Sequence, residues 1–215
     1  MPADTSSLRE RKKARTRLAI SEIATAMFIE RGFDAVTVAE VAAAAEVSVA
    51  TIFNYFETKE DLFFDREGEI IDAHRRAVRD RQVGETIVSA VHGAFLAAID
   101  AALPKLVSTG NAFLRTIDAS PSLRARARSA LEKAEAALAE TIAEETHAAA
   151  GDPTPRVVAT MIVAIERMLL EDAVAAILRG DAAGLARRRL RQTCDRAFAL
   201  LERGVKGYGR RSKAR

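Results

Sequence analysis

The chain of 215 residues contains a single cysteine, Cys194, and no tryptophan. One cysteine excludes an intrachain disulfide and favours a reducing compartment. Glycine and proline are scarce, at 11 and five residues, and alanine and leucine are plentiful, which together favour an all-helical protein. The most apolar stretch, 157–165, ends at Glu166 and is far shorter than the roughly 20 residues that a membrane-spanning helix needs. Because the first residues are polar and then basic, we also expect no signal peptide and a cytoplasmic protein.

Sequence patterns of catalysis and of metal binding are missing as well. His74, His92 and His147 show no ligand spacing with one another or with Cys194. The sequence has no nucleophile elbow, phosphate-binding loop or dinucleotide-binding fingerprint. We therefore expect no enzymatic activity, no cofactor and no metal site.

Charge is nearly balanced, with a formal net value of +3. The first 60 residues carry eight Lys and Arg against nine Asp and Glu, so bulk charge does not argue for nucleic-acid binding. Six of those eight basic residues, however, lie between Arg9 and Arg17. This cluster could reach a DNA backbone or minor groove, or it could be a solvated arm that only improves solubility.

A helix-turn-helix pattern lies between Thr37 and Phe56. Thr37 and Glu40 form a capping box, so a helix should begin at Val38. Its apolar stripe has the spacing i, i+3, i+4 and i+7, with Val38, Val41, Ala42 and Ala45. Glu46 to Ser48 form the turn, in which Val47 plugs the corner and Ser48 caps the second helix. The same spacing recurs there in Val49, Ile52, Phe53 and Phe56. Such a second helix can lie in the major groove of DNA.

The polar face of the second helix suits this role. Thr51 and Asn54 can hydrogen-bond base edges, small Ala50 lets the backbone approach the duplex, and the Tyr55 hydroxyl can reach a phosphate. Thr58, with Asp61 three residues on, is the N-cap of the next helix. Lys59 lies in the first turn of that helix, where its positive charge interacts unfavourably with the helix dipole, and a nearby phosphate would make the position favourable. From periodicity alone, an ordinary pair of helices with a solvated polar face remains an equal alternative.

The stretch from about Ala14 to Leu62 resembles the DNA-binding domain of the tetracycline-repressor (TetR) family of bacterial transcription regulators. The matching elements are ERGF at 30–33, Thr37, the VS pair at 47–48 and TIFNYFETKEDL at 51–62. The resemblance implies that Thr37, Tyr55 and Lys59 hold phosphates, and that residues 49–51 and Asn54 face the groove.

The predicted DNA-binding surface comprises Thr37, Ser48, Val49, Ala50, Thr51, Phe53, Asn54, Tyr55 and Lys59. One neighbour of this surface, Glu46, and one of its members, Phe53, depart from the pattern of the family. Glu46 stands where glycine is common, which predicts a strained or altered turn. Phe53 stands where tyrosine is frequent, so a hydroxyl contact to the DNA backbone should be missing there.

Helix signals continue along the chain. The expected helices run from Ser7 to Gly32, from Lys59 to about Arg81 with Gly68 inside, from Thr86 to Leu103 before Pro104, over 112–117, from Pro121 to Gly151, from Thr154 to about Arg179, and from Ala183 to about Arg203. Gly68 is either a tolerated weakness or a bend that connects the two domains.

We predict a helix-turn-helix domain over 1–58 and a helical effector-binding and dimerisation domain over 59–215. The function expected is a repressor, a homodimer through the last two helices, released from double-stranded operator DNA by a small apolar effector. Candidate effector contacts, although such residues are more often simply core, are His74, His92, Phe95, Asn111, Phe113, Met161 and Ile165. The alternative is an architectural DNA-binding dimer without an effector. Cys194 should be an inert buried thiol.

Overall fold

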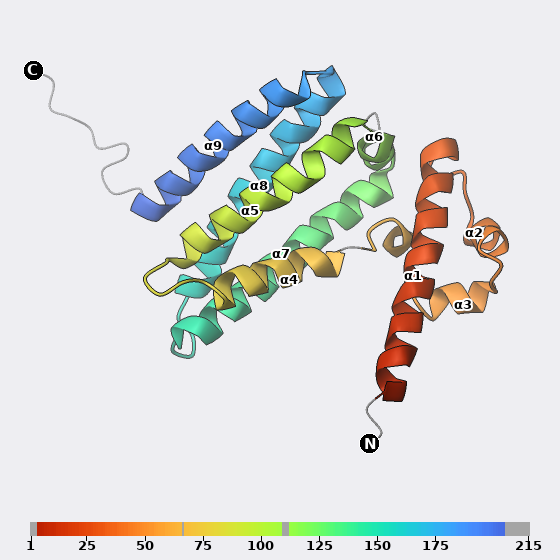
Figure 1. The fold of residues 1–215 in the computed structure, drawn as a ribbon, viewed down its shortest axis with the longest axis horizontal. Helices are drawn as coiled ribbons and strands as arrows, with labels where there is room; N and C mark the ends of the chain where they lie inside the picture. Colours follow the sequence, from red (N-terminus) through yellow and green to blue (C-terminus); the bar gives the residue numbers. More distant parts are fainter. Residues whose placement is uncertain (1–3, 66, 109–111, 205–215) are drawn as a thin grey trace, which may run out of the picture. The chain divides into compact units, whose positions relative to one another are not determined.

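The structure is a computed structural model, and it describes residues 4–65, 67–108 and 112–204 (Figure 1). The described residues form helices joined by short connections, and they include no strand. The helices are α1 (Asp4–Arg31), α2 (Val38–Ala44), α3 (Val49–Phe53), the 3-10 turn η1 (Glu60–Leu62), α4 (Glu67–Arg79), α5 (Ile87–Ser108), α6 (Ala112–Ala119), α7 (Pro121–Thr146), α8 (Thr154–Arg179) and α9 (Ala183–Arg203). This confirms the expected all-α fold.

Local signals determine several helix ends as expected. The hydroxyl of Thr37 accepts a hydrogen bond from the Glu40 amide, and the Glu40 carboxylate accepts one from the Thr37 amide, so the capping box is complete. Ser48 caps α3 through the Thr51 amide. Gly180 ends α8 with a φ of +78°, in the left-handed region where glycine carries no steric penalty.

The chain forms two compact units. Unit 1 comprises 1–68 and 112–129, and unit 2 comprises 69–111 and 130–215. Residues 112–129, which contain α6 and the start of α7, are distant in sequence from the helix-turn-helix but pack with it. The functional division that the sequence predicts near residue 58 stays a prediction.

The core of unit 1 holds the helix-turn-helix together. Phe28 from α1, Ile52 from α3 and Leu123 from α7 are almost completely buried in one cluster. The ring of Phe63 stacks on Phe113 of α6, with centroids 4.3 Å apart. Segments from both parts of the chain therefore stabilise the same small core.

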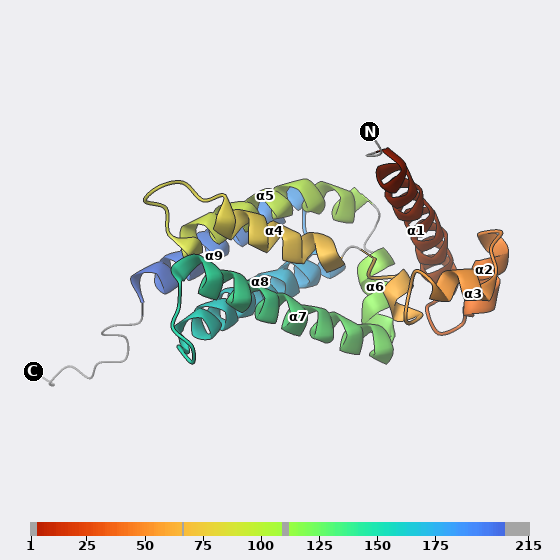
Figure 2. The same cartoon turned by 90° about the horizontal axis from the view of Figure 1, so that it is seen from below.

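Unit 2 is a bundle in which α9 packs against both α5 and α8 (Figures 1 and 2). Its core includes Val91 of α5, Ile162 of α8 and Phe198 of α9, all almost completely buried. Within the described part of the chain, no helix is long and apolar enough to cross a membrane.

Three expectations about helices were wrong. Helix α1 begins at Asp4 and not at Ser7, so a cap at Ser7 is not its start. Helix α5 does not stop before Pro104 but continues to Ser108, because the fixed φ of proline fits a helix and only one backbone hydrogen bond is lost.

The third correction concerns the predicted helix from Lys59 to Arg81, which is interrupted between η1 and α4. Phe63 and Phe64 are adjacent in sequence, yet both pack against the core of unit 1. Consecutive side chains of a helix point about 100° apart, so the chain leaves the helix to bury both rings. Gly68 is consequently the second residue of α4, and the idea of a bend inside one long helix loses its structural basis.

Candidate DNA-binding site

The turn of the helix-turn-helix depends on one residue in the left-handed region. Glu46 has a φ of +54°, which is unusual for a residue with a side chain. Its neighbours close the turn, because the Val47 amide donates to the Ala42 carbonyl at 3.0 Å. The expectation of an altered dihedral at Glu46 is confirmed.

The second helix, α3, buries one face and exposes the other. Ile52 and Phe56 are almost completely buried in unit 1, whereas Val49 and Phe53 are 39% and 52% exposed. Ser48, Ala50 and Asn54 are exposed too, and Thr51 and Tyr55 are half-buried. The structure therefore brings the predicted groove-facing residues onto one accessible face of α3. The exposed ring of Phe53 gives this face an apolar part.

Thr37 stands at the start of α2 beside a carboxylate. Its hydroxyl lies 2.8 Å from Oε2 of Glu40, and Oε1 of Glu40 accepts a hydrogen bond from Arg31 at 2.6 Å. These contacts, led by the one from the Thr37 backbone, lower the pKa of Glu40 to about 2. A phosphate at Thr37 would therefore approach an ionised carboxylate, although Arg31 partly offsets that charge.

Lys59 makes its contacts within unit 1. Its Nζ donates to the carbonyl oxygen of Phe33 at 2.6 Å and lies 4.2 Å from the centroid of the Phe33 ring. The same ammonium lies 5.5 Å from the centroid of the Phe28 ring. Burial lowers the pKa of Lys59, and the nearby carboxylate of Asp34 opposes that shift. In this conformation Lys59 joins the loop after α1 to the segment after α3.

Arg17 is a residue whose role the sequence did not reveal. It belongs to the basic cluster of α1, yet its guanidinium donates to the Tyr55 carbonyl and to the Asp65 carboxylate. It also stacks 4.5 Å from the centroid of the Phe56 ring. Arg17 thus fixes the end of α3 against α1. Nothing in the sequence pattern distinguished it from its solvated neighbours.

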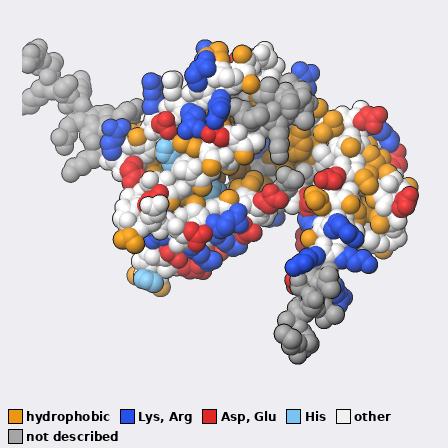
Figure 3. Space-filling view, in the orientation of Figure 1, with side chains coloured by type: hydrophobic (Ala, Val, Ile, Leu, Met, Phe, Trp, Pro, Cys, Tyr) orange, Lys and Arg blue, Asp and Glu red, His pale blue; other side chains and the backbone are white. Residues whose placement is uncertain are grey.

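The remaining basic residues of the cluster are accessible. Figure 3 shows Lys and Arg side chains gathered on the first half of α1. The exposed ones are Arg9, Arg11, Lys12, Lys13 and Arg15. They form a positive region that could contact phosphates by charge alone.

The predicted effector contacts do not form one group. Phe113 lies in unit 1, where its ring stacks on Phe63 and packs against the helix-turn-helix core, and its contact with an effector stays a prediction. Asn111 lies outside the described residues. Met161 is 44% exposed on α8, while Phe95 and Ile165 pack against the core of unit 2.

The two histidines among these predicted contacts have acidic partners in unit 2. His92 stacks on Phe198 and lies 3.0 Å from Oδ1 of Asp195. His74 and Glu166 are both more than nine-tenths buried, and Nε2 of His74 is 3.0 Å from each carboxylate oxygen. Among the described groups, Nδ1 of His74 is buried and has no hydrogen-bond partner. A buried polar atom without a partner is costly, so this pair stands out among the mostly apolar buried residues of unit 2.

Cys194 is completely buried on α9, as expected. Burial raises the pKa of its thiol to about 12, with Asp195 and Glu166 adding to the shift. A thiol in this environment is a poor nucleophile at neutral pH.

Comparison with known proteins supports the interpretation of this surface. The family model described as bacterial regulatory proteins, tetR family, matches residues 20–65. The regulator TcmR of Streptomyces glaucescens is 29% identical over 174 residues, which cover 75% of this chain and 74% of TcmR. LuxR of Vibrio harveyi is 47% identical over 58 residues, which are 24% of this chain and 28% of LuxR. Both relatives are HTH-type transcriptional regulators.

Solved structures share the fold. Native NalD of Pseudomonas aeruginosa, the secondary repressor of a multidrug efflux pump, matches with a TM-score of 0.55 and 17% identity, covering 86% of this chain and 97% of NalD. SmeT in complex with triclosan matches with a TM-score of 0.55 and 15% identity, over 87% and 90% of the two chains. At such identities these likenesses concern the fold alone.

The capped turn and the accessible face of α3 define a helix-turn-helix DNA-binding regulator of transcription. Residues 20–65 match the tetR family of bacterial regulatory proteins, and over 174 residues the chain is similar to the transcriptional regulator TcmR.

Proposed function

We propose that the protein is a dimeric cytoplasmic repressor that leaves its operator when a small apolar effector binds to unit 2. The observation that carries the DNA part is the accessible face of α3 above the buried Ile52 and Phe56. In this proposal Thr51 and Asn54 read base edges, and Val49, Ala50 and Phe53 make close apolar contact with the groove. Thr37, Ser48, Tyr55 and Lys59 contact phosphates.

Lys59 can reach a phosphate only after leaving Phe33. Its ammonium now donates to the Phe33 carbonyl, so binding to DNA must exchange this hydrogen bond for a phosphate contact. Such an exchange is reasonable energetically because the phosphate contact is charge-assisted. The alternative is that Lys59 stays in place and stabilises the reading head without touching DNA.

The buried pair of His74 and Glu166 is the proposed polar anchor for the effector. Nδ1 of His74 has no partner among the described groups, so an effector with one polar group could satisfy it. The core cluster of unit 2 contains apolar side chains of α5 and α8, which would suit an apolar body. Met161 is not part of this anchor, since it lies on an exposed face of α8.

Dimerisation is proposed through α8 and α9. Helix α8 exposes large apolar side chains with helical spacing at Val157, Met161 and Met168, and α9 exposes Leu185 and Leu200. These faces are available in addition to the faces that α8 and α9 bury against each other. A second copy that covers them would form a four-helix arrangement about a two-fold axis.

The DNA part can be tested by selecting duplexes from a random library with the full-length protein. We expect enrichment of a site with two related half-sites about one helical turn apart, or a multiple of it. Selection of unrelated sequences would exclude a specific reader. A reporter with the selected site over its promoter then tests repression, and increased expression would make the protein an activator.

The effector part needs a separate experiment. A library of small apolar molecules should contain members that release the protein from its selected duplex. If none releases DNA or raises the melting temperature, the alternative of an architectural dimer without effector is favoured. Sedimentation of a monomer at micromolar concentration would contradict the dimer.

A further inference from the structure

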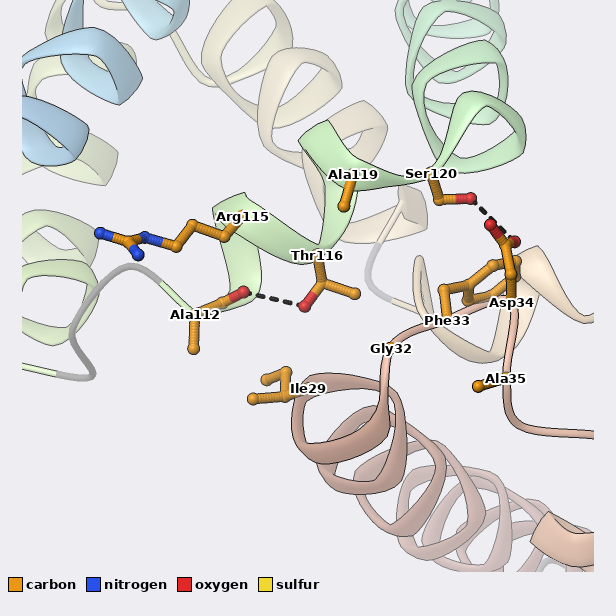
Figure 4. A pocket seen from close by; sticks show the side chains of 10 residues that line it. All are labelled: Ile29, Gly32, Phe33, Asp34, Ala35, Ala112, Arg115, Thr116, Ala119 and Ser120. Atoms are coloured by element: carbon orange, nitrogen blue, oxygen red, sulfur yellow. Dashed lines mark hydrogen bonds between the residues drawn. The ribbon is translucent and has the colours of Figure 1, made fainter.

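A cavity of about 430 Å³ lies within unit 1, and none of its lining residues belongs to the proposed effector anchor in unit 2. One wall is the end of α1 with the loop that follows it, and the other is α6 with the first residue before α7 (Figure 4). The lining residues are Ile29, Gly32, Phe33, Asp34, Ala35, Ala112, Arg115, Thr116, Ala119 and Ser120. This volume is within the range of pockets that hold small molecules.

The cavity is open because small residues face each other across it. Gly32 and Ala35 lie on one wall, and Ala112 and Ala119 on the other. A Cβ atom placed on Gly32 would meet no atom within 4 Å. Ile29, which is 38% exposed, supplies the larger apolar surface, and the almost completely buried Phe33 contributes only the edge that reaches the cavity. The walls therefore suit a compact apolar body.

The polar groups at the cavity leave one charge unmatched. The buried hydroxyl of Ser120 donates to Asp34 at 3.2 Å, and the hydroxyl of Thr116 donates to the Ala112 carbonyl at 2.9 Å. The carboxylate of Asp34 also faces the ammonium of Lys59. Arg115 is exposed, and within the described part of the chain no hydrogen bond or ion pair engages its guanidinium. Figure 4 shows the Arg115 side chain extending from α6 away from Ile29 and Phe33, so its guanidinium has to turn toward the cavity to pair with a bound anion. A planar guanidinium favours a carboxylate.

We propose that this cavity binds a small molecule with an apolar body and one carboxylate, and that its occupancy lowers the affinity of the protein for DNA. The carboxylate pairs with Arg115, and the body lies between Ile29, Phe33 and the alanines of α6. The occupant is distinct from the effector proposed for unit 2.

The path to DNA leads through Phe33. Its side chain lines the cavity, and its carbonyl oxygen accepts the hydrogen bond from Lys59. A ligand that packs on Phe33 and Ala35 holds the loop in its present position. Lys59 then stays withdrawn from phosphate, so the ligand favours the conformation that binds DNA less tightly.

Equilibrium dialysis of the full-length protein against 2-naphthoate tests the binding site, with 2-naphthamide as the uncharged analogue. We expect naphthoate to bind and the amide to bind about 5- to 10-fold more weakly, because it lacks the charge. Arg115→Gln should weaken naphthoate binding to the same degree, whereas Arg128→Gln, an exposed arginine of unit 1 outside the cavity, should not. Absence of binding at about 1 mM naphthoate, or equal binding by both arginine variants, would overturn the proposal.

A second variant blocks the cavity itself. Ala119→Leu places a larger side chain among the lining residues and should reduce naphthoate binding at least 10-fold, while Ala125→Leu on the exposed face of α7 should leave it unchanged. Melting curves of both variants verify folding. Undiminished binding by a folded Ala119→Leu protein would place the ligand elsewhere and refute the site.

The coupling to DNA is measured on a random duplex, so that it does not depend on the proposed repressor function or on an operator. Saturating naphthoate should weaken binding of the wild-type protein about 3- to 10-fold. In Lys59→Met, which cannot make the phosphate contact, naphthoate should still bind but should no longer change DNA affinity. An equal response of wild type and Lys59→Met would refute the path through Phe33. Failure of any effector at unit 2 would leave both measurements unaffected.

Discussion

The ammonium of Lys59 donates to the carbonyl oxygen of Phe33 and at the same time lies over the Phe33 ring, 4.2 Å from its centroid. One residue of the loop after α1 thus supplies both a hydrogen-bond acceptor and a π-face to the same cation. Lys59 therefore has a structural role in the free protein whether or not it also contacts DNA.

Lys59→Met keeps most of the side-chain length and removes the charge, so it separates these two roles. Loss of the hydrogen bond and of the cation–π contact should lower the free energy of unfolding by roughly 1 to 2 kcal/mol. Urea denaturation measures this loss, and Lys59→Arg is the control that retains the charge. An unchanged denaturation midpoint would mean that the contact contributes nothing in solution.

Glu46 should be replaceable by glycine with a gain in stability. Its φ of +54° is costly for a residue with a Cβ atom and natural for glycine. Glu46→Gly should raise the free energy of unfolding by about 0.5 to 1 kcal/mol. Ala45→Gly at the preceding position, where φ is −86°, should lower it. Thermal denaturation of both variants checks the sign, and destabilisation by Glu46→Gly would show that its side chain has an unrecognised contact.

The low pKa of Glu40 predicts an acid-sensitive contribution to stability. The folded pKa of about 2 is below the ordinary value of 4.5, so the stabilisation is present above pH 4.5 and is lost as the pH falls toward 2. Glu40→Gln should therefore melt below the wild type at pH 6, and the difference should shrink as the pH falls below 4.5. Glu57→Gln, at an exposed position outside the network, is the control. A difference that stays constant down to pH 3 would argue against an ionic role for Glu40.

The helix ends that depend on local interactions could be predicted from the sequence. The caps at Thr37 and Ser48 and the end of α8 at Gly180 depend on residues within one turn, so a short pattern contains the whole cause. Likewise, the spacing of Ile52 and Phe56 predicted which face of α3 is buried. The class of protein followed from these local features together with the family resemblance.

Contacts between distant segments could not be predicted in this way. The break before α4 arises because the core of unit 1 takes both Phe63 and Phe64, and Phe113 reaches that core from about 50 residues further along the chain. The position of Lys59 depends on Phe33, and that of Arg17 on Asp65. The cavity beside α6 is formed by two segments that are distant in sequence, so no single stretch of residues predicts it.

The buried pair in unit 2 allows a double-mutant test. Removing one partner leaves the other buried and unpaired, so His74→Leu should destabilise the protein by roughly 3 to 5 kcal/mol. The double variant His74→Leu with Glu166→Leu replaces both polar groups by apolar ones and should recover most of that loss. Urea unfolding of the two single variants and the double variant gives the coupling. Simple addition of the two losses would mean that the pair is not coupled in solution.

The sharpest test of the proposed DNA contacts compares Asn54 with Lys59. If Asn54 hydrogen-bonds a base edge, Asn54→Ala should lose about 1 to 3 kcal/mol on the selected operator and almost nothing on a random duplex, because its contact depends on sequence. Its salt dependence should stay at the wild-type value, since no phosphate contact is removed. If Lys59 reaches a phosphate, Lys59→Met should weaken binding to both duplexes alike and lower the slope of log K against log salt by about 1 per subunit. Binding isotherms of both variants on both duplexes at several salt concentrations provide all four comparisons. If Asn54→Ala loses the same affinity on both duplexes, a face of α3 other than the one bearing Thr51 and Asn54 reads the bases. If Lys59→Met leaves the salt slope unchanged, Lys59 has only its structural role at Phe33.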